Sequence, residues 1–129
     1  MSNETHKLAR KLARKQAEQR GRRAEMFAAW LLRFKGYTIL EERQKTPHGE
    51  VDLIALKGKV LAIIEVKQRL TLELAQQALH NADLSRIEEA AYYYQAKHTK
   101  WENKTIRFDA VFVMPNLKIK HVKDAWRGY

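Results

Sequence analysis

Residues 49–69 read Gly-Glu-Val-Asp-Leu-Ile-Ala-Leu-Lys-Gly-Lys-Val-Leu-Ala-Ile-Ile-Glu-Val-Lys-Gln-Arg, and this stretch decides the fold. Two apolar runs, 51–56 and 60–66, flank a short break at 57–59. This is the pattern of two β-strands joined by a tight turn. Apolar residues occupy consecutive positions in both runs, so helices or other layers are expected to cover both faces of the hairpin.

The turn sets which hairpin residues face one another. A two-residue turn at 58–59 places Asp52 opposite Glu65 and Glu50 opposite Lys67. Opposed Cβ atoms lie ~5 Å apart, so two buried carboxylates would repel one another there unless a divalent cation bridges them. Lys67 follows Glu65 by two residues, points to the same face and can hold a water or a phosphoryl oxygen. The alternative is an ordinary cross-strand ion pair without a metal.

The motif Gly-Glu-Val-Asp-Leu-Ile at 49–54, followed by Ile-Glu-Val-Lys-Gln-Arg at 64–69, resembles the YraN-like family. That family is classed as endonucleases by fold and motif, within the PD-(D/E)xK superfamily of restriction enzymes and Holliday-junction resolvases. The resemblance spans about residues 20–113, including the segments 21–25 and 107–109. It implies a restriction-endonuclease-like α/β layered domain, with a mixed central sheet flanked by helices.

The resemblance also implies roles for individual residues. Asp52 and Glu65 correspond to the metal-binding acids, Lys67 to the catalytic lysine, and Glu25 to a further acid supplied by the first helix. Val51 stands where the superfamily name has proline, which is common in this family. Asp83 stands where a basic residue is expected, and this removes one predicted phosphate contact.

Composition indicates a nucleic-acid partner. The 129 residues carry a net charge of +10, which favours a polyanion over an anionic membrane surface. No apolar run reaches the ~20 residues needed to cross a bilayer, and without cysteine there are no disulfides or thiolate zinc sites, so a cytoplasmic location is expected. The length fits one nuclease-like domain, residues 20–129, preceded by a basic arm, residues 1–19.

The arm and the remaining elements follow from periodicity. Residues 1–23 hold eight Lys or Arg and two Glu, with Leu8 and Leu12 at helical spacing, which predicts a phosphate-contacting arm or a solvated extension. A helix over 20–35 is expected to bury one apolar stripe. That stripe comprises Phe27, Trp30, Leu31 and Phe34. A strand over 37–44, one or two helices over 71–97 with N-cap signals at Thr71 and Ser85, and strands over 106–114 and 117–122 complete the chain.

Together these features predict a Mg²⁺- or Mn²⁺-dependent nucleic-acid phosphodiesterase, an endonuclease acting on DNA and, by the resemblance, on branched DNA. The predicted phosphate contacts are Arg20, Arg22, Arg23, Arg69 and Arg86. A non-catalytic nucleic-acid-binding module on the same fold is the main alternative, and an assembly protein that uses the basic arm is a third. Junction resolvases of this superfamily act as dimers, so a homodimer is open.

Overall fold

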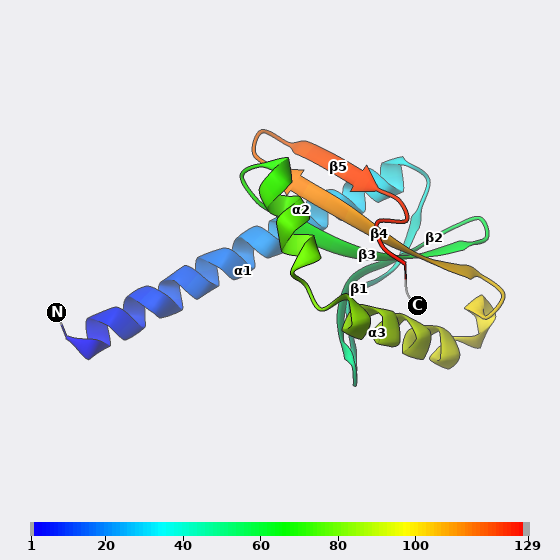
Figure 1. Cartoon of the computed structure of the whole chain (residues 1–129), viewed down its shortest axis with the longest axis horizontal. Coiled ribbons are helices and arrows are strands. Elements are labelled where there is room, and N and C mark those ends of the chain that lie inside the picture. Colours follow the sequence, from blue (N-terminus) through cyan, green and yellow to red (C-terminus); the bar gives the residue numbers. More distant parts are fainter. Residues whose placement is uncertain (1, 128–129) are drawn as a thin grey trace.

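The fold is built around one five-stranded sheet (Figure 1). The structure is a computed structural model that describes residues 2–127 of the chain. The elements are α1 (Asn3–Phe34), β1 (Thr38–Thr46), β2 (Gly49–Lys57), β3 (Val60–Gln68), α2 (Leu72–His80), α3 (Leu84–Lys97), a 3₁₀ turn (Thr99–Trp101), β4 (Thr105–Met114) and β5 (Lys118–Val122). The strand order is β1-β2-β3-β4-β5, with only β3 and β4 parallel. Helix α1 covers one face, and α2 and α3 cover the other. The predicted α/β layered domain with a mixed sheet is confirmed.

The central hairpin has the predicted register. Pairs run from Leu53 and Ile64 to Lys57 and Val60, joined by a turn in which Gly58 adopts a φ of 58°. The regular pairing stops there, so Asp52 and Glu65 lie one step beyond the last ladder pair. Beyond that point β3 pairs only with β4, while β2 stays with β1. The predicted pairing of Glu50 with Lys67 is wrong, because the β2–β3 ladder ends at Leu53 and Ile64, and Glu50 pairs only with Lys45 of β1.

Helix α1 packs through small residues. Its buried side chains are Ala24, Ala28, Ala29 and Leu32. The predicted core stripe is wrong, since Trp30 is 60% and Phe34 91% exposed, while Phe27 and Leu31 are only partly buried. Alanines on the contact face let the helix approach the sheet closely, and the large side chains project from other faces.

The basic arm is part of α1. The helix starts at Asn3, where the Ser2 hydroxyl accepts a hydrogen bond from the Thr5 backbone N–H, and it continues without a break into the domain. Every residue from 3 to 20 is exposed, and this half of α1 projects well beyond the sheet (Figure 1). The expected boundary between residues 19 and 20 therefore falls inside a helix.

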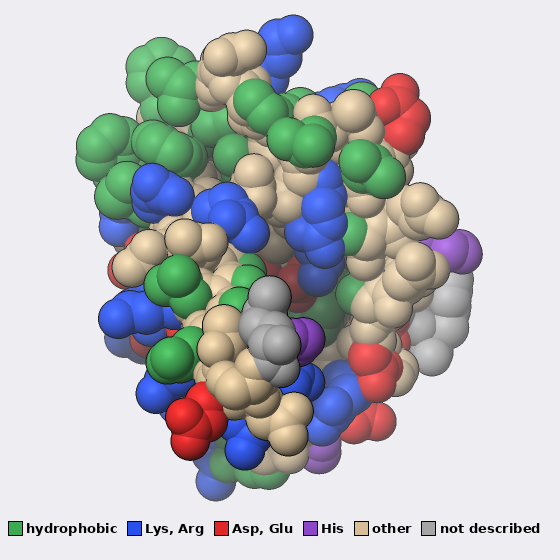
Figure 2. Space-filling model, turned by 90° about the vertical axis from the view of Figure 1, so that its left-hand side faces the viewer, with side chains coloured by type: hydrophobic (Ala, Val, Ile, Leu, Met, Phe, Trp, Pro, Cys, Tyr) green, Lys and Arg blue, Asp and Glu red, His purple; other side chains and the backbone are tan. Residues whose placement is uncertain are grey.

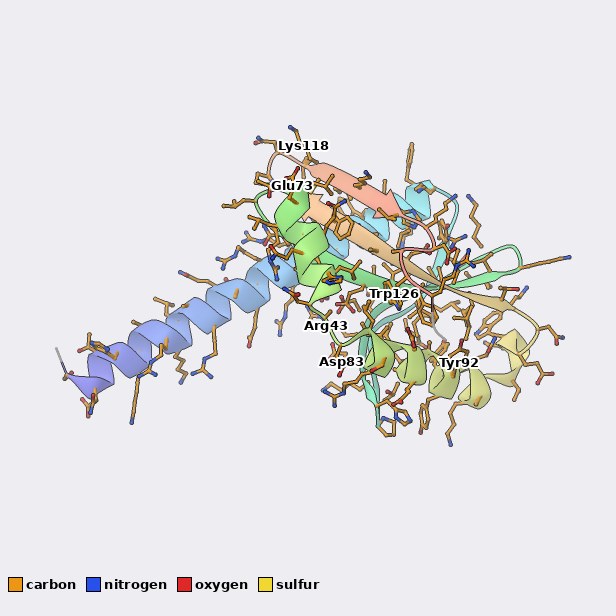
Figure 3. All side chains as sticks on the ribbon, viewed as in Figure 1. Arg43, Glu73, Asp83, Tyr92, Lys118 and Trp126 are labelled. Atoms are coloured by element: carbon orange, nitrogen blue, oxygen red, sulfur yellow. The ribbon has the colours of Figure 1, made fainter. Side chains whose placement is uncertain are left out.

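Two helices, not one, connect β3 to β4. Thr71 caps α2 as predicted, its hydroxyl accepting from the Leu74 N–H. The cap expected at Ser85 is wrong, because Asp83 caps α3 and accepts from both the Arg86 N–H and the Ser85 hydroxyl. Asp83 sits at the start of α3 in Figure 3, where its carboxylate is free to reach the first turn.

Strand β5 and the C-terminal segment complete the domain. β5 forms the predicted edge strand beside β4. Trp126 stacks on Phe108 and packs in the cores beneath both α2 and α3 (Figure 3). Over residues 2–127, no helix is long and apolar enough to cross a membrane.

Candidate metal and nucleic-acid site

The site forms where β2 and β3 separate. Past Ile64 the β2-facing edge of β3 has lost its strand partner, and the Asp52 carboxylate takes its place: Oδ2 accepts the Val66 backbone N–H at 2.8 Å. Side-chain alternation in β2 is interrupted at this point, because Val51 packs beneath α3 whereas Leu53 packs beneath α1. The local break turns Asp52 into the gap between the strands and fixes its carboxylate there.

An open cleft of about 900 Å³ surrounds this gap. All four residues predicted to be catalytic line it: Glu25 from α1, Asp52 from β2, and Glu65 and Lys67 from β3. Figure 2 shows acidic atoms at the bottom of a central hollow with Lys and Arg side chains on its rim. Positions spread over 43 residues of sequence, from Glu25 to Lys67, thus meet in one place.

Asp52 and Glu65 lie close together in a buried site, where two negative charges repel one another. Burial, and then the negative charge of Glu65, raise the pKa of Asp52 to about 8. Glu65 is itself buried, and its Oε1 lies 3.4 Å from the Lys67 ammonium. Burial and the neighbouring carboxylate thus favour the protonated form of Asp52 in the metal-free protein.

Glu25 is anchored by a residue that the sequence did not single out. Arg43 of β1 donates from Nε to Glu25 Oε2 at 2.7 Å. Burial raises the pKa of Glu25, and the Arg43 hydrogen bond opposes that rise. Arg43 has a φ of 52°, and β1–β2 pairing skips Arg43 and Asp52 together. No sequence pattern around Arg43 signals this role, which depends on how β1 lies beside α1.

The predicted phosphate contacts separate into groups. Arg20 and Arg69 line the cleft, and Arg23 lines a neighbouring groove between α1 and the β4–β5 turn. Arg86 of α3 reaches the opposite side of Glu65. Arg22 is exposed but lines none of these cavities. Two exposed leucines on the cleft wall, Leu70 and Leu74, were not predicted.

The donor set suits a hydrated hard cation. Among residues 2–127, no three His, Asp or Glu side chains gather closely enough to form a complete protein ligand shell. Mg²⁺ is commonly held by one or two carboxylates and keeps several waters or phosphate oxygens. Asp52 and Glu65 therefore fit this kind of ion, with Glu25 held apart by Arg43.

A second charged cluster lies away from the cleft, on the α1 side of β4. Asp109 is fully buried and accepts two hydrogen bonds from Arg107, at 2.8 and 2.7 Å. His121 Nε2 lies 2.9 Å from Asp109 Oδ2, and the Asp124 backbone N–H donates at 3.0 Å. Burial favours the protonated carboxyl, but these partners together lower the pKa of Asp109. In the sequence, the only sign of this cluster was the presence of Arg107 and Asp109, two residues apart, in the otherwise apolar run of β4.

Comparison with known proteins identifies the family. The profile of the uncharacterised protein family UPF0102 matches residues 24–113. A UPF0102 protein of Caulobacter vibrioides is 43% identical over 112 residues, covering 87% of this chain and 90% of that protein. One from Bartonella tribocorum is 43% identical over 117 residues, covering 91% and 90%. The matched segment contains Glu25, Asp52, Glu65 and Lys67, and it confirms the resemblance seen in the motif. The chain belongs to the uncharacterised protein family UPF0102.

Proposed function

We propose that this protein is a Mg²⁺- or Mn²⁺-dependent phosphodiesterase that cleaves nucleic acid, with DNA as its substrate. The observation that carries the proposal is the buried pair of carboxylates, Asp52 and Glu65, beside Lys67 in an open cleft. Repelling acids with a perturbed pKa in a cleft are typical of functional sites. A divalent ion held between them would relieve the repulsion.

Each residue has a distinct part in the proposed reaction. A cation on Asp52 and Glu65 would supply a Lewis acid that polarises the scissile phosphate and acidifies a bound water. The Lys67 ammonium donates to the attacking water or to the phosphoryl oxygen on which charge develops. The Val66 N–H keeps Asp52 aimed into the cleft, and Arg43 positions Glu25 to hydrogen-bond water around the site.

A basic path leads from the arm to the cleft. Residues 7, 11, 14, 18, 21 and 25 follow one face of α1, so Lys7, Lys11 and Arg14 lie in line with Glu25. Arg20 and Arg69 continue this charge into the cleft. A polyanion bound along this face would pass over the acids with its phosphates neutralised by α1.

Incubation with candidate substrates tests the proposal. Plasmid, single-stranded DNA, RNA and a four-way junction should be offered with Mn²⁺ and, in parallel, with chelator. Cleavage in Mn²⁺ alone, lost in Asp52→Ala, is the expected result. Absence of cleavage of all four, together with absence of calorimetric Mg²⁺ or Mn²⁺ binding, would refute it.

A non-catalytic nucleic-acid-binding module is the second candidate. It is favoured by the ion pair of Glu25 with Arg43, which leaves only Asp52 and Glu65 as candidate ligands in the cleft, and by the lack of a three-ligand cluster in the described chain. Such a module would bind nucleic acid with a steep salt dependence and would show no metal site that depends on Asp52.

Replacing Lys67 by alanine separates chemistry from metal binding. A lysine ammonium cannot ligate Mg²⁺ but can stabilise a developing anion, so cleavage should fall ~10²-fold or more while metal affinity changes little. Single-turnover cleavage and calorimetric titration measure the two quantities. Equal losses of both would make Lys67 a structural partner of Glu65.

Removing residues 1–19 tests the arm. None of residues 2–19 is buried, so the melting temperature of the domain should change little. Nucleic-acid affinity should fall, and the slope of log K against log salt should flatten, because five of the arm's cations, Lys7, Arg10, Lys11, Arg14 and Lys15, are lost. An unchanged slope would remove the arm from the interface.

A further inference from the structure

Helix α1 carries a second, apolar face that its own domain leaves open. Its exposed large hydrophobic residues are Leu8, Leu12, Met26, Trp30 and Phe34. At ~100° per residue, all five fall within ~80° of one another around the helix axis. They form one stripe, here called the outer stripe, which extends from the arm to the end of α1.

The outer stripe points away from the sheet. Of the four residues that α1 buries, Ala24, Ala28 and Leu32 lie on nearly the opposite side of the helix from the outer stripe, and Ala29 lies between the two faces. No described element covers the stripe, and Trp30 is 60% exposed. The outer stripe has two apolar ends, Leu8 with Leu12 and Met26 with Trp30 and Phe34, separated by polar side chains. Exposed large apolar side chains grouped in this way mark an interaction site.

The spacing of the outer stripe is self-complementary. If two α1 helices lie antiparallel with Gln19 at their midpoint, Leu8 of each copy opposes Trp30 of the other, and Leu12 opposes Met26. Gln19 then meets its own counterpart on a twofold axis. In a twofold-symmetric dimer the same surface of both subunits forms the interface, so that surface must be complementary to itself.

The geometry permits this arrangement. With Gln19 at the midpoint, the matched apolar seam runs from Leu8 to Trp30 and is ~33 Å long. A strip as wide as a helix, ~12 Å, on each of two copies amounts to ~800 Å², which is the size of a weak, reversible interface. Because the outer stripe faces away from the sheet, the two domains would lie on opposite sides of the helix pair without overlapping. The basic face and the cleft of each copy stay open.

We propose that a second copy of this chain covers the outer stripe, with the two α1 helices packed antiparallel about Gln19. This inference does not rest on the proposed function. Lys15 of one copy would oppose Arg23 of the other in the polar middle of the seam. Like charges so placed repel through water, so added salt strengthens the dimer. An acidic partner or an anionic membrane would bind more weakly in salt.

Sedimentation of the full chain over a concentration series, at low and high salt, tests the dimer. We expect a reversible dimer whose dissociation constant falls with salt. The double variant Leu8→Gln/Leu12→Gln, which keeps helix propensity, should weaken it ~tenfold or more. Leu70→Gln, an equally exposed leucine outside the stripe, is the matched control and should leave it unchanged. A chain that stays monomeric at every concentration and salt overturns the proposal.

Cross-linking gives an independent check, since the chain has no cysteine. Gln19→Cys places two thiols on the twofold axis and should give a disulfide-linked dimer under mild oxidation. Ala17→Cys, on the far side of the helix, should not. Equal cross-linking of both variants would contradict the antiparallel pairing. A second result would also contradict the dimer: the wild-type monomer binds phosphatidylserine vesicles, and Leu8→Gln/Leu12→Gln abolishes this binding. The outer stripe would then be a membrane-binding surface.

Discussion

Asp52→Asn is expected to abolish cleavage and to make the metal-free protein more stable. The amide can still accept the Val66 N–H, whereas the charge repelled by Glu65 is gone. At pH 8 the metal-free variant should exceed wild type by on the order of 5 kcal/mol in the free energy of unfolding, because the pKa of Asp52 rises from 3.8 to about 8 and each unit corresponds to ~1.4 kcal/mol. Denaturant unfolding in chelator measures the difference.

The pH dependence of that difference has a definite sign. Folding raises the pKa of Asp52 from 3.8 to about 8, so the folded wild type holds a proton that the unfolded chain releases. Wild-type stability in chelator should therefore fall, relative to the variant, as pH rises from 4 to 8, and level off above. Mg²⁺ well above its dissociation constant should stabilise wild type by ~2–3 kcal/mol and the variant much less. If Asp52→Asn melts well below wild type in chelator, the carboxylate is a structural salt-bridge partner.

Asp109→Ala is expected to cost ~3–5 kcal/mol of stability, because it leaves the Arg107 guanidinium and the His121 ring without their buried partner. Urea unfolding at neutral pH measures the loss. Since the folded pKa of Asp109 lies below 3.8, its stabilisation is present above that pH and is lost as pH falls through the folded value. Wild type should thus lose stability in acid more steeply than the variant.

A surface carboxylate provides the control for that measurement. Asp124 pairs with Arg127 in an exposed ion pair and adopts a φ of 53°, a conformation that asparagine tolerates. Asp124→Asn should change stability by less than ~1 kcal/mol. A loss of that small size in Asp109→Ala would show that the buried network contributes little to folding.

The sequence by itself determined the central hairpin and the identity of its acids. The positive φ at Gly58 fixes the turn, and the apolar runs on either side fix the register of the hairpin. A slip of one residue would move every side chain of a strand to the other face of the sheet. Charged residues within such runs stand out, because burying them needs a partner. Local pattern therefore sufficed to select Asp52, Glu65 and Lys67, and the family profile covers all three.

Only the tertiary structure decided which face of α1 packs and what holds the acids in place. Large apolar residues signal burial by their hydrophobicity, yet close approach of a helix to a sheet selects small ones, so Ala24 and Ala28 are buried while Trp30 stays exposed. The bond from Val66 to Asp52 exists because β2 leaves β3 one residue early, and the pair of Arg43 with Glu25 exists because β1 lies beside α1. Such contacts join residues distant in the chain, and no local periodicity encodes them.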